Sequence, residues 1–338
     1  MEKKDLLKDV VEHIDIKKYD STELINAMRK MSFTSRDTAR AADILCQMIA
    51  EKDCTNILTI AGSTSAAGCM QVYVEMVRNK MVDAVVSTGA SIIDMDLFEA
   101  LGYKHYIGTK ENVIPDTKLR ELYIDRIYDT FIDEEELQAC DQATCDVADT
   151  LECRPYSSRE FLYEVGKWLA NGHGVKKESL IQTCYECGVP IFCPAFSDSS
   201  AGFGIGKHQW LRKKAGKPYV SIDSVADFLE LTEIKMNSPQ SGLFMVGGGT
   251  PKNFAQDTVV CAEILGHEVP KFPVVTRESR RNSRKTTWLP RHRKMKPFPA
   301  PAPQEKSHVR SWRSKGHLAP LMRPSKFPEI PVSLERSR

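Results

Sequence analysis

Short apolar runs alternate along the first 269 residues with longer stretches in which apolar side chains recur every three to four positions. The runs 56–61, 82–86, 191–193 and 242–246 have the length and composition of strands buried on both faces. The intervening stretches carry stripes at helical spacing, as in Ala41, Ile44, Leu45, Met48 and Ile49. This alternation predicts an α/β fold with a doubly wound, mostly parallel sheet and helices on both faces.

Local signals mark where several helices begin. Ser157 and Glu160 form a capping box, and Thr250 followed by Pro251 supplies an N-cap and a first-turn proline. The acidic block 133–136 suits a solvated helix start, where carboxylates face the positive end of the helix dipole. Residues 103–156 otherwise show no regular pattern.

Small and polar residues follow four of the predicted strands: Gly62-Ser63, Thr88-Gly89, Ser197-Asp198 and Gly247–Gly249. The carboxyl ends of parallel strands meet at one edge of a sheet, where ligands bind in open α/β folds. Glycine lets the backbone approach a ligand, and the following helix N-termini present N–H groups to anionic oxygens. We therefore expect a ligand site at this edge, and we expect its ligand to be a nucleotide bound through its pyrophosphate. Turns and helix caps explain any single end equally well.

The stretch after Ser200 contains three glycines, and we expect its backbone to bend freely. Several other motifs are absent. No G-x-G-x-x-G opens a first βαβ unit, and the phosphate-loop pattern around Lys207 is incomplete. Cys184 and Cys187 lack a partner pair at zinc spacing, which indicates structural cysteines and no metal site. We expect His105, His173 and His208 to be surface or satisfied residues.

Composition changes abruptly near residue 270. Residues 270–338 hold 18 Lys+Arg against 4 Asp+Glu, whereas residues 1–269 hold 29 against 41. All ten cysteines precede the boundary. We therefore expect a folded domain over 1–269 and a basic, Pro-rich tail over 270–338 without stable structure. The absence of an apolar span or signal peptide predicts a cytoplasmic protein with free thiols and no membrane contact.

The strand-end segments resemble the deoxyhypusine synthase family, in particular its prokaryotic synthase-like branch. The resemblance covers about residues 30–270 and is specific, since no short generic motif carries it. The matching segments are 58–68, 82–91, 94–96, 99–101, 189–202 and 247–253.

The resemblance implies NAD as cofactor and a polyamine such as spermidine as substrate. An aminobutyl group passes through an imine on an enzyme lysine to an acceptor amine, which is a protein lysine or a small amine. The implied homotetramer shares its active sites across a dimer interface. The implied NAD-binding residues are Gly62, Ser63, Thr88, Gly89, Asp198 and Gly248, and the implied substrate-binding residues are Asp94, Asp96 and Asn253.

Three departures from the family pattern bear on the substrate. Asp94-Met95-Asp96 replaces two adjacent glutamates, Phe203 replaces an amine-binding aspartate, and Asn253 replaces a histidine. The last two changes remove features expected to bind spermidine, so the resemblance leaves the identity of the polyamine open.

The tail departs further, because the family's Trp-Gly-Lys motif with its nucleophilic lysine is not intact. The segment Pro299–Pro303 can be encoded so that a shifted frame gives Cys-Ser-Ser-Ser, which suggests a frameshifted family terminus. Lys315, three residues after Trp312, is the catalytic lysine that the sequence offers. Two alternatives remain open. The chain is a catalytically silent NAD-binding or oligomeric member, or its tail is a nucleic-acid-binding arm, which the abrupt boundary disfavours.

Overall fold

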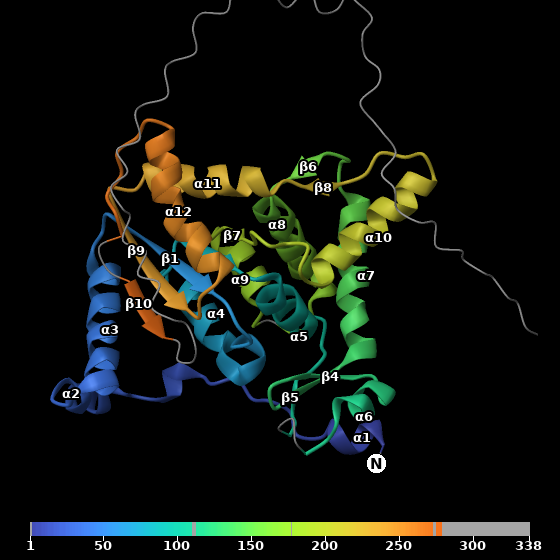
Figure 1. Cartoon of the computed structure of the whole chain (residues 1–338), viewed down its shortest axis with the longest axis horizontal. Helices are drawn as coiled ribbons and strands as arrows, with labels where there is room; N and C mark the ends of the chain where they lie inside the picture. Colours follow the sequence, from blue (N-terminus) through green and yellow to red (C-terminus); the bar gives the residue numbers. More distant parts are fainter. Residues whose placement is uncertain (1, 110–112, 177, 273–274, 279–338) are drawn as a thin grey trace, which may run out of the picture. The chain divides into compact units, whose positions relative to one another are not determined.

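A computed structural model describes residues 2–109, 113–176, 178–272 and 275–278. A five-stranded sheet lies at the centre of the unit formed by Met1–Arg281 (Figure 1). Every neighbouring strand pair is parallel, which confirms the predicted sheet. In spatial order the strands are β10 (Val275–Glu278), β9 (Gln240–Val246), β1 (Cys54–Ile60), β2 (Ala84–Ser87) and β7 (Ile191–Phe192).

This strand order contains a topological switch point. From β1 the chain proceeds through β2 to β7 on one side, and then returns to place β9 and β10 on the other. Crossovers leave β1 and β9 in different directions, so a crevice is expected between their carboxyl ends. The switch point therefore adjoins the strand ends with Gly62 and with Gly247–Gly249.

Helices cover both faces of the sheet, and successive β1 residues pack into opposite layers, as the strand pleat requires. Leu58 belongs to a large apolar cluster shared with α4 (Met70–Arg78), α8 (Ser158–Trp168) and α9 (Leu180–Cys187). Ile57 belongs to the opposite cluster, shared with α11 (Ser224–Met236) and α12 (Thr250–Ile264). The predicted doubly wound arrangement is therefore confirmed.

The remaining helices flank this core. In α3 (Phe33–Ala50) only part of the predicted apolar stripe faces the core. Met48 is buried, whereas Ile49 is exposed. Helices α7 (Glu134–Thr150) and α10 (Ser200–Lys214) pack against each other. The other helical segments are α1 (Lys3–Leu6), α2 (Thr22–Arg29), α5 (Phe98–Ala100), α6 (Asp116–Glu121), a 3-10 turn (Ile16–Lys18) and π-helical turns (Ser65–Cys69, Ala90–Leu97, Leu169–His173).

The predicted helix starts are largely confirmed. The Glu160 amide donates to Ser157 Oγ at 3.1 Å, and the Ser157 amide donates to Glu160 Oε2 at 3.2 Å. Asp133 caps α7, which confirms the acidic helix start. In α12 the N-cap is Gly249 instead of Thr250, one residue earlier than predicted, and Pro251 lies in the first turn.

Residues 103–156 contain a small antiparallel sheet that the sequence did not predict. Its strands run in the order β3 (Tyr106–Ile107), β5 (Thr130–Asp133) and β4 (Ile124–Ile127). Strands of two to four residues are too short to show a periodic pattern. A two-stranded parallel sheet joins β6 (Pro155–Tyr156) to β8 (Ser221–Ile222).

The expectation of freely bending backbone after Ser200 is wrong, because Gly202, Gly204 and Gly206 all lie within α10. At Gly202 a Cβ atom would lie 2.3 Å from the Ser197 carbonyl oxygen, and at Gly204 it would lie 1.9 Å from Thr144 Oγ1. Two of these glycines therefore permit close packing of a regular helix.

The ten cysteines are free thiols, as predicted. Cys184 is buried and Cys187 is exposed, without a bond between them. Among the helices in the described ranges, none has the length and apolar character required to cross a bilayer.

Candidate functional site

Contacts link the four strand ends at the carboxyl edge of the sheet. A Cβ atom on Gly247 would lie 2.4 Å from the Ala61 carbonyl oxygen, so the ends of β9 and β1 touch. Ser91 Oγ donates to the Gly62 carbonyl oxygen at 2.8 Å, which joins the ends of β1 and β2. A Cβ atom on Gly89 would lie 2.3 Å from Ser199 Oγ, so the end of β2 meets the start of α10.

The glycines at this edge fall into two groups. Gly89 and Gly247 are closely packed, whereas an added Cβ on Gly62, Gly248 or Gly249 would meet no atom within 4 Å. Gly62 and Gly249 also have positive φ angles of 82° and 71°, which disfavour other residues. Open backbone therefore lies at the ends of β1 and β9, on both sides of the switch point.

Hydroxyl groups surround these glycines. The Thr88 side chain is half-buried. Its Oγ1 lies 3.0 Å from Ser91 Oγ and accepts a hydrogen bond from the Ser91 amide at 3.3 Å. Ser63 is half-buried after β1. The Thr88 hydroxyl thus helps to hold the turn after β2, and Ser63 keeps part of its surface accessible.

Asp94 lies beside the first turn of α10. Its Oδ1 accepts from the Ser200 amide at 2.8 Å. Burial raises the pKa of Asp94 to about 6, and the like charges of Asp141 and Asp198 add to this, against opposing hydrogen bonds from Ser200. Asp94 therefore changes its charge near neutral pH, which suits a group that exchanges a proton.

Asp96 has a different environment, although it lies only two residues from Asp94. It is fully buried and accepts from Ser179 Oγ and from the Leu180 and Ile181 amides at 2.8 to 2.9 Å. Burial raises its pKa to about 6, against these three hydrogen bonds. Asp96 thus caps the start of α9, and its predicted substrate-binding role stays a prediction.

The other predicted site residues lie at the surface. Asp198 is exposed between β7 and α10, and Asn253 is exposed in the first turns of α12. Phe203 is 65% exposed in the first turn of α10. Gly248 and Asn253 follow β9, whereas Asp198 follows β7, so both sides of β1 contribute residues.

Sequence reasoning missed a charged cluster around Glu99. This buried carboxylate contacts His13 Nε2 at 2.6 Å, His105 Nδ1 at 2.8 Å and the Lys176 ammonium group. Burial opposes ionisation, but the two histidines and Lys176 hold the pKa of Glu99 well below its usual range. His105 was expected to be a surface or satisfied residue; Glu99 satisfies its Nδ1, whereas its Nε2 is buried without a partner. The members of this cluster are spread between residues 13 and 176, so no sequence motif linked them.

The predicted catalytic residue Lys315 lies outside the described residues. A buried lysine, Lys235, occurs elsewhere, and its ammonium group contacts Ser241 Oγ and lies 4.4 Å from the Phe272 ring centroid. Burial lowers its pKa, as an imine-forming lysine requires. However, Ser241 lies at the start of β9, so Lys235 is at the wrong edge of the sheet for this site.

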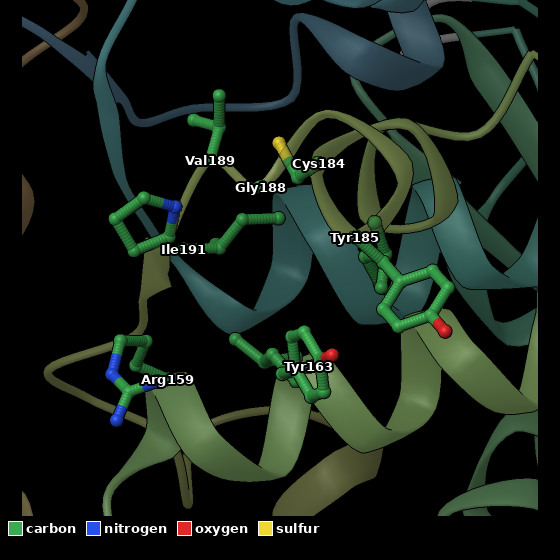
Figure 2. A pocket seen from close by; sticks show the side chains of 10 residues that line it. Arg159, Tyr163, Cys184, Tyr185, Gly188, Val189 and Ile191 are labelled. Carbon is green, nitrogen blue, oxygen red and sulfur yellow. The ribbon is translucent and has the colours of Figure 1, made fainter.

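A pocket of about 180 Å³ lies between α8, α9 and the entry to β7. Figure 2 shows the side chains that line it. Arg159 and Tyr163 come from α8, Cys184 and Tyr185 from α9, and Val189 from the segment before β7. The pocket adjoins the amino end of β7 and thus lies away from the carboxyl ends of the strands, where the candidate site is. It is distinct from the candidate site.

Comparisons with known proteins agree with this architecture. The family model for deoxyhypusine synthase matches residues 23–279. A deoxyhypusine synthase-like protein of Caulobacter vibrioides is 63% identical over 79% of this chain and 72% of its own length. One from Coxiella burnetii is 56% identical, with coverages of 79% and 74%.

A more distant relative and a solved structure also match. A protein of Methanosarcina mazei named "Probable deoxyhypusine synthase 2" is 39% identical, over 76% of this chain and 72% of its own. The crystal structure of "a putative deoxyhypusine synthase from Entamoeba histolytica" has a TM-score of 0.50 at 20% identity. It covers 71% of this chain and 79% of its own, and supports the fold. The chain therefore belongs to the deoxyhypusine synthase family.

Proposed function

We propose that the chain is an NAD-dependent transferase that moves an aminobutyl-type group from a spermidine-like polyamine to an acceptor amine. Family membership supports a deoxyhypusine synthase-like transferase function. The observations that carry the finer proposal are the open glycine backbone at the switch point and the half-buried Asp94 carboxyl group at the start of α10. A nucleotide and a cationic amine are the ligands that suit these two features.

The strand-end residues fit a dinucleotide. Gly62 and Gly248 leave space for a ligand to approach the backbone, and the half-buried side chains of Ser63 and Thr88 offer hydroxyl groups. Closely packed Gly89 fixes the end of β2 against the start of α10, where Asp198 lies. NAD bound there would supply the hydride acceptor. We assign its binding to these strand ends.

Acidic side chains suit a polyamine cation. Asp198 is exposed and Asp94 is half-buried, and each can offer negative charge to a cation. Asp94 in its ionised form can accept the proton that an ammonium group loses before its carbon is oxidised. Asn253 provides an uncharged hydrogen-bonding group on the β9 side. Asp96 stays a proposed substrate-binding residue, and its oxygens also accept hydrogen bonds at the start of α9.

Lys315 remains the proposed imine-forming residue. The acceptor is proposed to be a protein lysine or a small amine, and the assembly a homotetramer, as family resemblance implies. We also propose a cytoplasmic location, from the cysteine content and the lack of an export signal in the sequence. A silent family member is the second candidate, because the Trp-Gly-Lys motif is not intact in the sequence.

The proposal is tested with the purified full chain, NAD, spermidine and a diamine acceptor. Cleavage of spermidine at its aminobutyl carbon releases 1,3-diaminopropane, so we expect this product and an aminobutylated acceptor by mass spectrometry. Lys315→Ala should abolish both and leave NAD binding intact. NAD binding without product would support the silent member. Loss of NAD binding itself would overturn the assignment of the strand ends.

Gly248→Val tests the nucleotide site. The valine side chain enters space that is open in the structure, so we expect at least a tenfold loss of NAD affinity by calorimetry, about 1.4 kcal/mol, with an unchanged melting temperature. Gly206→Val is the control, because its surroundings are equally open but lie within α10. Equal NAD affinity in both variants would place the nucleotide elsewhere.

A further inference from the structure

Residues 9–14, which we call the N-terminal strap, are fixed at their first half by the small antiparallel sheet. The Ile107 amide of β3 donates to the Asp9 carbonyl oxygen at 2.6 Å, and the Val11 amide donates to the His105 carbonyl oxygen at 2.9 Å. Backbone paired in both directions has a defined position and direction. The strap therefore continues from the edge of β3 along a set path.

The second half of the strap crosses the turn of residues 62–69, which links β1 to α4. The Ile14 amide donates to the Gly68 carbonyl oxygen at 3.0 Å. A Cβ atom on Gly68 would lie 2.7 Å from the Glu12 carbonyl oxygen, so the two backbones touch. Gly68 also has a φ angle of 89°, which disfavours other residues. The strap thus contacts the turn at a position that has no room for a side chain.

The same turn begins with Gly62 and Ser63, which are proposed to bind NAD. Within the turn, the Ala67 amide donates to the Ser63 carbonyl oxygen at 3.1 Å. Ala67 precedes Gly68, where the strap makes its contact. A displacement of the strap therefore reaches the Ser63 backbone through one peptide unit and one hydrogen bond.

His13 anchors the centre of the strap in the core. Its Nε2 lies 2.6 Å from Glu99 Oε2, and both side chains are largely buried. His13 Nδ1 is buried without a hydrogen-bond partner, so Glu99 provides the bond that orients the ring. Although burial opposes ionisation, the hydrogen bonds from His105 and His13 keep the pKa of Glu99 well below its usual range. The bond is therefore made to a charged acceptor, which strengthens it.

We propose that His13 is a positioning residue for the nucleotide site. By fixing the N-terminal strap against Glu99, it holds the turn of residues 62–69 in the conformation that receives NAD. The family model matches residues 23–279, so the strap extends the site beyond the matched region. The inference rests on the proposed function for the identity of the nucleotide, whereas the contact between strap and turn is testable without a ligand.

The first measurement is amide hydrogen exchange in the full chain without ligand, in peptides that cover residues 62–69. In His13→Ala we expect roughly tenfold faster exchange, because a hydrogen bond to a charged group is lost. His13→Gln should restore much of the protection, since its side-chain amide can donate to Glu99 in place of Nε2. Lys176→Met is the control, because it removes a partner of Glu99 that is not part of the strap. Wild-type exchange in folded His13→Ala, or equal acceleration in Lys176→Met, would overturn the proposal.

The second measurement is NAD binding by calorimetry. His13→Ala should weaken the affinity roughly fivefold or more, His13→Gln should recover most of it, and Lys176→Met should match the wild type. Because coupling is reciprocal, NAD should also slow amide exchange at Val11 and Ile14 in the wild type. Unchanged NAD affinity in His13→Ala would overturn the positioning role. A wild type that binds no NAD, with faster exchange in His13→Ala, would confirm the contact between strap and turn and contradict the proposed function.

Discussion

At the residue scale, two buried carboxyl groups with similar pKa values have different hydrogen-bond partners and therefore different roles. Asp94 and Asp96 are two residues apart and both have a pKa raised to about 6, yet one faces α10 and the other caps α9. Sequence alone could place both near the end of β2. It could not separate them, because the capping partners of Asp96 begin at Ser179, far along the chain.

Asp227 offers a test of this burial effect outside the candidate site. It is fully buried, its Oδ1 accepts from the Arg159 amide at 3.1 Å, and its Oδ2 has no partner. Burial raises its pKa to about 6, above the value of about 3.9 in an unfolded chain. The folded state therefore favours protonated Asp227. This contribution to the free energy of unfolding is fully present below pH about 4 and is lost as the pH rises through 6.

Asp227→Asn should remove this pH dependence. At pH 7.5 we expect the variant to be more stable than the wild type by roughly 1–3 kcal/mol, since it no longer buries a charge. At pH 4 the difference should be small. Urea unfolding at both pH values measures the effect, with Asp146→Asn as an exposed control. A variant that is destabilised equally at both values would contradict the argument.

At the element scale, the helices and strands of the core were predictable and their contacts were not. Continuous apolar runs revealed β1, β2 and β9, and capping residues revealed α7 and α8. The glycines of α10 misled the prediction, because glycine serves both flexible turns and tight helix contacts. Only the packing partner distinguishes the two uses, and for Gly204 that partner lies on α7.

Gly204→Ala tests this contact. The new Cβ would overlap Thr144 and backbone atoms of α7 that cannot rotate away, so we expect a loss of about 1–3 kcal/mol in unfolding free energy. Gly206→Ala in the same helix meets no atom within 4 Å and should gain about 0.5–1 kcal/mol from helix propensity. Chemical denaturation compares the pair. If both variants are stabilised, the α7–α10 contact is looser than described.

At the scale of the whole described unit, the N-terminal segment is bound to the core from both sides of His13. The Val11 amide donates to the His105 carbonyl oxygen at 2.9 Å, and the Ile14 amide donates to the Gly68 carbonyl oxygen at 3.0 Å. His13 itself reaches Glu99. Gly68 lies in the turn after β1, so this segment supports the turn that follows Gly62 and Ser63.

His13→Ala should weaken this support. Glu99 would lose one partner while remaining buried, which we expect to cost about 2 kcal/mol at pH 7. Because the pKa of Glu99 is lowered, the stabilisation is present above pH about 4.5 and is lost as the pH falls further. Thermal unfolding at pH 7 and pH 3 measures the effect, with the exposed His173→Ala as control. An equal loss at both pH values would exclude the ionic contribution.

The position of β1 at the centre of the sheet has a consequence for synthesis on the ribosome. Cys54 pairs with Gln240 and Ile60 with Val246, so β1 and β2 emerge long before β9. At elongation rates of about 5–20 residues per second, the edge of β1 that pairs with β9 stays unpaired for roughly ten to forty seconds. An unpaired strand edge of this kind recruits other chains. Nascent chains should therefore be most prone to aggregate in this interval, and chaperones that cover the edge should raise the soluble yield.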